Sequence, residues 1–264
     1  MIKKILNIYA RSLKTLMNKP FKNVLIITDN LFIYKKFKAI IKKSDFSKTN
    51  FTYKFSCNNK DFVKKFKSER NFRSIDVKTE FKKIIDRFDL VISVHSKQLF
   101  PEELVKNIKC INIHPGFNPY NRGWYPQVFS IINKLPLGAT IHEIDVKIDH
   151  GRIIDQEEIP LFQWDTSLTA YDRVLQTELL LIEKNIKKII NNTYSVKKIK
   201  KEGNLNLKND FNKLCELNLN EVTSFQTFID RLRALSHGDY KNAFFIDKKS
   251  GKKIFVSINF KLDE

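Results

Sequence analysis

Cysteine and glycine are both scarce in this chain of 264 residues, which has three cysteines and seven glycines. Cys57, Cys110 and Cys215 are odd in number and far apart, so the sequence predicts neither a disulfide framework nor a metal site, and a cytoplasmic location fits best. Neither GxGxxG nor GxxxxGK[ST] occurs, which removes the usual signals of dinucleotide-binding and P-loop proteins. No apolar run approaches the roughly 18–20 residues of a membrane span.

Acidic residues are also few: 29 Asp and Glu stand against 48 Lys and Arg, which gives a net charge of +19. Such a charge alone suits a nucleic-acid-binding protein. The lysines, however, are scattered along the chain, which is also rich in Ile, Asn and Phe, as is typical of a genome-wide compositional bias. We therefore predict no nucleic-acid partner, although a basic surface would suit a substrate that carries a pyrophosphate.

Residues 1–22 form an accessory segment in which apolar side chains recur near helical spacing and lysines interrupt them. The segment has neither the unbroken apolar region nor the small-residue cleavage site of a secretory signal. We predict an accessory amphipathic helix, with a role at a membrane surface as the alternative.

From residue 23 onward, short apolar strands alternate with helices. The clearest strands are the buried runs 23–28 and 90–94, and a helix over 31–43 follows two capping residues. This alternation predicts a Rossmann-like α/β fold, with a mostly parallel sheet, helices on both faces and ligands at the carboxyl ends of the strands. The other predicted elements up to residue 190 are strands 51–56, 74–78, 110–114, 137–144 and 152–161, and helices 61–66, 81–87, 102–107, 125–133 and 168–190.

Residues 23–190 are predicted as the catalytic domain, and residues 191–264 as a linker with a small C-terminal α+β extension. The linker is expected to be irregular over 191–210. The extension is too small to be a confident independent domain, so we expect it to pack on the main domain or on a second subunit. Its predicted elements are a helix near 222–235 and a hairpin of strands 243–247 and 253–260.

Two polar motifs interrupt the apolar pattern. Asn112 and His114 lie two residues apart at the end of a predicted strand, so both side chains point to one face, and proline follows at once. Asp149 precedes a His-Gly turn between two predicted strands. An ordinary turn residue would explain either motif alone. Together they resemble the hydrolase-like formyltransferase family, which includes glycinamide ribonucleotide, methionyl-tRNA and nucleotide-sugar formyltransferases, over about residues 23–190.

The resemblance implies that Asn112, His114 and Asp149 are catalytic and that N10-formyltetrahydrofolate is the formyl donor. The residue types suit this chemistry, because Asn112 can donate to the carbonyl oxygen that becomes negative, and His114 can take the amine's proton or, when protonated, help to hold that oxygen. Asp149 would orient and charge-stabilise His114 or relay a proton through water, and the sequence leaves both roles open. No covalent nucleophile is needed.

The same resemblance places the folate pterin against the loop after residues 90–94 and the segment 144–149. Ordinary core packing is an equally good explanation of each residue there. The candidate cofactor-binding residues are Gln98, Phe100, Ile144 and Asp145.

Three segments resemble the nucleotide-sugar enzymes of the family: residues 94–101, 118–127 and 235–240. The middle segment offers aromatic rings that could stack on a base or sugar and a cation that could bind a pyrophosphate. We predict transfer to dTDP-4-amino-4,6-dideoxyglucose, in the synthesis of a bacterial O-antigen. The candidate substrate-binding residues are Asn30, Lys97, Asn118, Tyr120, Arg122, Trp124 and Tyr125.

Three alternatives stay open. The amine could lie on C3 of a dTDP-3-amino-3,6-dideoxy sugar. The chain could formylate methionyl-tRNA, which its charge favours and its short C-terminal segment does not. It could also be a basic nucleic-acid-binding protein with a degenerate enzyme fold, although the intact catalytic set argues against decay. The resemblance further implies a homodimer joined through C-terminal elements, with an edge strand within residues 243–260.

Overall fold

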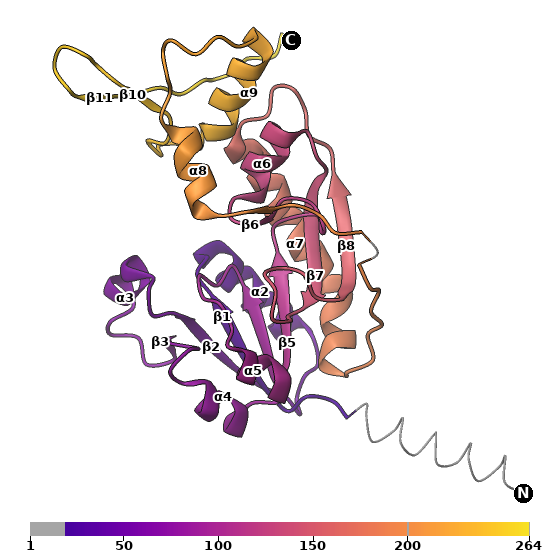
Figure 1. The fold of residues 1–264 in the computed structure, drawn as a ribbon. Helices are drawn as coiled ribbons and strands as arrows, with labels where there is room; N and C mark the ends of the chain where they lie inside the picture. The colour runs from indigo at the N-terminus through magenta and orange to yellow at the C-terminus, as the bar shows by residue number, and fades with distance from the viewer. Residues whose placement is uncertain (1–18, 200, 264) are drawn as a thin grey trace, which may run out of the picture. The chain divides into compact units, whose positions relative to one another are not determined.

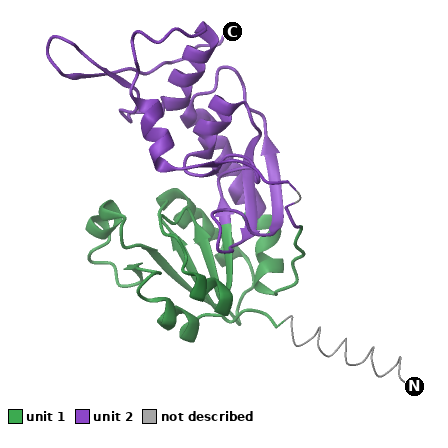
Figure 2. Cartoon of the chain, viewed as in Figure 1, with its two compact units in different colours: residues 1–112, 182–197 green, residues 113–181, 198–264 purple. Residues whose placement is uncertain are grey.

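The computed structural model describes residues 19–199 and 201–263, so the helix expected in the N-terminal segment lies outside the described residues (Figure 1). The chain divides into two compact units. One unit contains residues 1–112 and 182–197, and the other contains residues 113–181 and 198–264, as Figure 2 shows.

The first unit is built on parallel strands that are apolar on both faces. Val24 to Ile27 in β1 and Leu90 to Ile92 in β4 are fully buried, as expected of strands covered on both sides. β1 lies between β2 and β4, and β2 also pairs with β3, always in parallel. The strands are β1 (Asn23–Thr28), β2 (Asn50–Ser56), β3 (Phe72–Ile75) and β4 (Leu90–Val94).

Helices alternate with these strands, and α2 (Leu31–Lys43) shows why they form. Its N-cap is Asn30, whose side-chain oxygen accepts a hydrogen bond from the backbone N–H of Ile33 at 3.1 Å. Ile33, Phe37 and Ile40 then bury one stripe of the helix. The other helices of this unit are α3 (Lys60–Lys65), α4 (Phe81–Arg87) and α5 (Glu102–Asn107).

The second unit is organised around the antiparallel hairpin of β7 (Leu137–Glu143) and β8 (Ile153–Ile159). Every residue of β7 is buried. The C-terminal extension packs against the same unit, because Ala234 of α9 lies in one apolar cluster with Val128 and Ile131 of α6. The remaining elements are β6 (Arg122–Gly123), α6 (Pro126–Asn133), β9 (Leu205–Asn206), α8 (Lys208–Cys215), α9 (Phe225–Leu235), β10 (Phe244–Ile246) and β11 (Lys253–Phe255).

Two elements contribute residues to both units: β5 (Lys109–His114) and α7 (Ser167–Ile190). The seven-stranded sheet has the order β3-β2-β1-β4-β5-β7-β8, and the two-stranded sheets are β10-β11 and β6-β9. The predicted class, a mostly parallel α/β sheet with a small C-terminal extension that ends in a hairpin, is confirmed. No helix in the described part of the chain is long and apolar enough to cross a membrane.

Two local predictions were wrong. The strand predicted over 74–78 lies at Phe72–Ile75, because its register follows its pairing with β2, where Tyr53 lies opposite Phe72. The stretch 191–210, predicted to be irregular, contains β9 and the start of α8. β9 forms only because Leu205 and Asn206 pair with Arg122 and Gly123, more than 80 residues earlier in the chain.

Candidate active site

His114 is the last residue of β5, at the point where the strand gives way to the loop over 115–125. Its side chain is almost fully buried, at 3% exposure. Asn112 is two residues earlier and half-buried, and the alternation of side chains along a strand places both on the same face. The predicted amide and imidazole therefore share one face of one strand.

Asp149 lies in the turn between β7 and β8 and has a φ of +46°, in the left-handed region that few side chains adopt without support. The neighbouring Gly151 allows the turn to close, because a Cβ there would lie only 1.7 Å from the backbone oxygen of Glu143. Backbone strain at a catalytic candidate, held by close packing, is typical of a functional position.

Three groups converge on the Asp149 carboxylate. The backbone N–H of Gly123 donates to Oδ2 at 3.1 Å. His114 Nδ1 lies 3.5 Å from Oδ2, and His142 Nε2 lies 3.5 Å from Oδ1. The carboxylate is thus placed between two imidazoles, and one of them is His114, the residue that Asp149 was predicted to orient or to assist in proton relay.

The electrostatics of this cluster favour an ionised Asp149. Burial acts to raise the pKa of the carboxyl, but His114, His142 and the Gly123 N–H act in the opposite direction and prevail. The pKa of Asp149 therefore lies well below its usual range. A permanent carboxylate beside Nδ1 of His114 favours the tautomer that carries its proton on Nδ1, which leaves Nε2 as the nitrogen that exchanges a proton with a reactant.

His142 is a functional candidate that the sequence analysis missed. Its side chain is buried, and its Nδ1 lies 2.7 Å from the backbone oxygen of Glu143. A carbonyl oxygen only accepts, so we infer that Nδ1 carries a proton, while Nε2 faces Asp149. The register of β7 and β8 shifts between Ile141 and His142, a bulge of the kind that re-aims side chains near active sites.

The loop after His114 is held against β7. The hydroxyl of Thr140 donates to the backbone oxygen of Gly116 at 2.7 Å and accepts from the backbone N–H of Asn118 at 3.1 Å. The side chain of Asn118 is buried and donates to the backbone oxygen of Asp149 at 2.9 Å. This predicted substrate-binding residue thus ties the loop to the catalytic turn.

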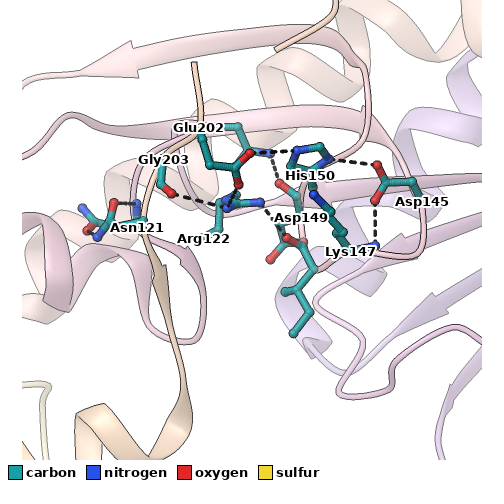
Figure 3. Close-up of polar contacts among 11 residues, drawn as sticks. Asn121, Arg122, Asp145, Lys147, Asp149, His150, Glu202 and Gly203 are labelled. Carbon is teal, nitrogen blue, oxygen red and sulfur yellow. Dashed lines mark hydrogen bonds and ion pairs between the residues drawn. The ribbon is translucent and has the colours of Figure 1, made fainter. Parts of the chain in front are cut away.

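Arg122, predicted to bind a pyrophosphate, is also buried, at 5% exposure. Its Nη2 lies 2.6 Å from a carboxylate oxygen of Glu202, and Nη1 donates to the backbone oxygen of Ile148 at 3.4 Å (Figure 3). The guanidinium therefore holds the turn that carries Asp149, and Glu202 is a second residue that the sequence analysis missed.

The aromatic residues of the same loop are more accessible. Trp124 is 36% exposed, and Lys208 Nζ lies 5.6 Å from the centre of its ring. The Tyr125 ring lies 4.2 Å from the Phe211 ring, so it packs against the C-terminal extension. Tyr120 is half-buried. Of these, Trp124 has the surface that a stacked base would need.

The predicted binding residues of the first unit lie at the carboxyl ends of β1 and β4. Lys97 is exposed, and its backbone N–H donates to Asp29 Oδ2 at 2.8 Å. Gln98 donates through its amide to the backbone oxygen of Ile75 at 3.0 Å and accepts from the N–H of Val77 at 2.9 Å, so its side chain braces the loop. Phe100 is half-buried, and Asn30 caps α2 as described.

Ile144 and Asp145 open the turn that carries Asp149, and both are half-buried. Asp145 accepts from the backbone N–H of Lys147 at 2.9 Å and lies 3.1 Å from His150 Nδ1, so its side chain shapes the turn (Figure 3). Within the described residues, no group of His, Cys, Asp and Glu side chains is arranged to hold a metal ion.

Comparison with known proteins identifies the family of the chain. A family model described as Formyl transferase matches residues 23–186, and one described as N-formyltransferase dimerization C-terminal domain matches residues 210–262. The chain belongs to the formyl transferase family. The predicted family and the predicted reaction class, one-carbon transfer, are thereby confirmed.

Individual relatives narrow the resemblance to sugar N-formyltransferases. A dTDP-4-amino-4,6-dideoxyglucose formyltransferase of Mycobacterium tuberculosis (strain ATCC 25618 / H37Rv) is 49% identical over 183 residues, which are 69% of this chain and 78% of that protein. A solved 4-N formyltransferase from Francisella tularensis is 42% identical, with a TM-score of 0.86 over 92% of this chain and 99% of that chain. An N-formyltransferase from Helicobacter canadensis, solved with folinic acid and dTDP-3-aminofucose, shares the fold at 22% identity, with a TM-score of 0.60 over 81% and 80%.

Proposed function

We propose that this protein transfers a formyl group from N10-formyltetrahydrofolate to the 4-amine of dTDP-4-amino-4,6-dideoxyglucose. The observation that carries the proposal is the contact of His114 with Asp149 at the end of the strand that also bears Asn112. The name of the Mycobacterium tuberculosis relative supports the sugar, and the name of the Francisella tularensis protein supports attack by a 4-amine.

In the proposed reaction, a bond forms between the sugar nitrogen and the formyl carbon, and the bond from that carbon to the folate nitrogen breaks. His114 Nε2 accepts the proton that the attacking amine loses and returns one to the folate nitrogen. Asn112 donates its amide hydrogens to the formyl oxygen as that oxygen gains negative charge. Asp149 keeps the Nδ1 proton of His114 in place and stabilises the ring while it is charged.

The co-substrate supplies only an activated formyl group, so this chain has to bind it and exclude water. The residue at position 116 bears on this fit: a Cβ on Gly116 would lie 2.5 Å from the buried His114 Nε2, so any residue other than glycine would crowd the nitrogen that exchanges the proton. Phe100, Ile144 and Asp145 would hold the pterin. Gln98 would contribute by bracing its loop, since both ends of its amide bind the backbone of residues 75–77.

For the nucleotide sugar, we propose that Trp124 stacks on the base or the sugar and that Lys97 meets the pyrophosphate. Both side chains have an exposed surface. Asn30 and Tyr120 would contact hydroxyl or carbonyl oxygens. Arg122 and Asn118 would act indirectly, by holding the turn that carries Asp149, because both donate hydrogen bonds to its backbone.

The direct test is turnover of dTDP-4-amino-4,6-dideoxyglucose in the presence of N10-formyltetrahydrofolate, followed by mass spectrometry of the nucleotide sugar. The expected product carries one added formyl group on nitrogen. Parallel reactions with a dTDP-3-amino-3,6-dideoxy sugar and with methionyl-tRNA test the two rival substrates. Turnover of either rival without turnover of the 4-amino sugar would reject the proposed substrate but would still support formyl transfer as the reaction.

We also propose a homodimer joined through the C-terminal extension, which the family model of residues 210–262 describes as a dimerization domain. The β10–β11 hairpin presents Ile246, Ile254 and Phe255 with 40% or more of their surface exposed. Light scattering at several concentrations would measure the mass, and Ile254→Lys should shift it toward the monomer.

The proposed location is the cytoplasm, and the proposed destination of the product is a bacterial O-antigen.

A further inference from the structure

Residues 202–206, here called the strap, lie against the loop that follows His114. Its backbone bonds this loop at several points: the N–H of Arg122 donates to Asn204 O at 3.1 Å, and the N–H of Trp124 donates to Asn206 O at 2.9 Å. The strap approaches so closely that a Cβ on Gly203 would lie 1.8 Å from the backbone oxygen of Pro119. The strap and the loop therefore have one fixed register.

Glu202 at the start of the strap connects two parts of the site (Figure 3). One carboxylate oxygen lies 2.6 Å from Arg122 Nη2, and the other lies 3.2 Å from His150 Nε2. His150 is the residue after Asp149, and its other ring nitrogen lies 3.1 Å from Asp145. Each ring nitrogen of His150 therefore contacts a carboxylate, and the ring links Glu202 to the turn.

The two partners of Glu202 act on the residues before and after Asp149 in the chain. Arg122 also donates to the backbone oxygen of Ile148, the residue before Asp149, while Gly123, the residue after Arg122, donates its N–H to the Asp149 carboxylate at 3.1 Å. His150 is itself the residue after Asp149, and its contact with Glu202 holds that side of the turn. A displacement of Glu202 would therefore change both the backbone around Asp149 and the donor that its carboxylate meets.

We infer that Glu202 is a positioning residue for formyl transfer, acting through Arg122 and His150 on the turn that carries Asp149. The inference rests on the proposed function. If Glu202 has this role, the rate of the reaction depends on a residue that lies after α7, outside the segments that contain the catalytic residues. The side chain of Glu202 is 62% exposed, and exposed ion pairs add little to stability, so its main expected contribution is to geometry.

The test compares Glu202→Ala and Glu202→Gln with Glu158→Ala, an exposed carboxylate on β8 that serves as the matched control. Glu202→Ala is expected to lower kcat about 10- to 100-fold with KM for the nucleotide sugar changed less than about threefold, because small misplacements of catalytic groups have effects of this order. Glu202→Gln keeps an oxygen for Arg122 and should recover part of the loss. Glu158→Ala should behave as wild type.

A kcat within about twofold of wild type in both Glu202 variants, or a loss confined to KM, would overturn the inference. If Glu202→Ala fails to fold, which Arg122 without its carboxylate could cause, Glu202→Gln decides by the same criteria. Imidazole ¹⁵N NMR of His114 and His142 gives a readout that needs no turnover: their signals should shift in the Glu202 variants and not in Glu158→Ala. If wild type formylates no amino sugar, the proposed function fails, and this NMR comparison still decides whether Glu202 controls the turn.

Discussion

Replacement of Gly116 by alanine should inactivate the protein while leaving it folded. The added Cβ would lie 2.5 Å from His114 Nε2, 2.9 Å from His114 Cδ2 and 3.1 Å from a carbon of Pro126. Non-bonded heavy atoms are comfortable at about 3.5 to 4.0 Å, so a separation of roughly 1 Å has to be created. The Thr140 hydroxyl holds the Gly116 oxygen at 2.7 Å, so the backbone resists and the imidazole is the group that moves.

A shift of about 1 Å in a catalytic group can cost on the order of 100-fold in rate, and we expect a fall of that size in kcat for Gly116→Ala. Overpacking should lower the free energy of unfolding by about 1–3 kcal/mol, which leaves the protein folded at room temperature. The assay is steady-state formylation of the dTDP-4-amino sugar, together with a urea denaturation curve.

The control is Gly251→Ala, whose Cβ would have no atom within 4 Å but whose φ of +67° is strained for alanine. It should lose stability and keep kcat. A Gly116→Ala protein that folds and retains wild-type kcat would refute the geometry.

The other predictions concern the groups around Asp149. Asp149→Asn should lower kcat by about 10³-fold or more, because orienting carboxylates elsewhere have effects of this order. Since the pKa of Asp149 is depressed in the folded protein, its charge stabilises the fold above the unfolded value near 3.9 and loses this effect as pH falls further. The difference in unfolding free energy between wild type and Asp149→Asn should therefore be full at neutral pH and shrink in acid; a constant difference would contradict the assignment. His142→Gln removes one group that lowers the pKa of Asp149, so ¹³C NMR should show that carboxyl titrating at higher pH than in wild type, and an unchanged titration would count against a role for His142. Arg122→Met should lower kcat about 10-fold by releasing the turn, whereas a pure rise in KM for the nucleotide sugar would restore the pyrophosphate role predicted from the sequence.

Much of the fold could be predicted because its strands are contiguous apolar runs and its helices carry local stop signals. The bounds of α2 and β4 agree with the predictions to the residue. The errors lie where structure depends on distant partners. The α8 helix has a polar sequence and forms where Phe211 and Leu214 pack on the cluster that contains Leu232 and Leu235. Such packing leaves no periodic signal in a short segment.

The catalytic candidates could be predicted for a different reason. Asn112 and His114 combine a spacing of two with the end of an apolar strand, and Asp149 precedes a glycine turn, so each has a local signature. His142 had a weaker one: Thr140 and His142 alternate on β7, so two polar side chains face one side of a strand in which every residue is buried. Reading that alternation as a functional face would have identified His142 from the sequence.

Glu202 had no such signature, and the reason is physical. Its partners are 80 residues away at Arg122 and 52 residues away at His150, and a lone glutamate among lysines in a polar linker is typical of a solvated surface. The left-handed backbone conformation of Asp149 costs about 1–3 kcal/mol and persists where the surroundings over-determine it. The structure supplies that support from three separate segments: the N–H of Gly123, the ring of His142 and the link from Glu202 through His150. We therefore expect the stiffness of the turn to depend on these contacts with other segments. A change in the strap should therefore alter the geometry at Asp149 more than the overall stability of the chain.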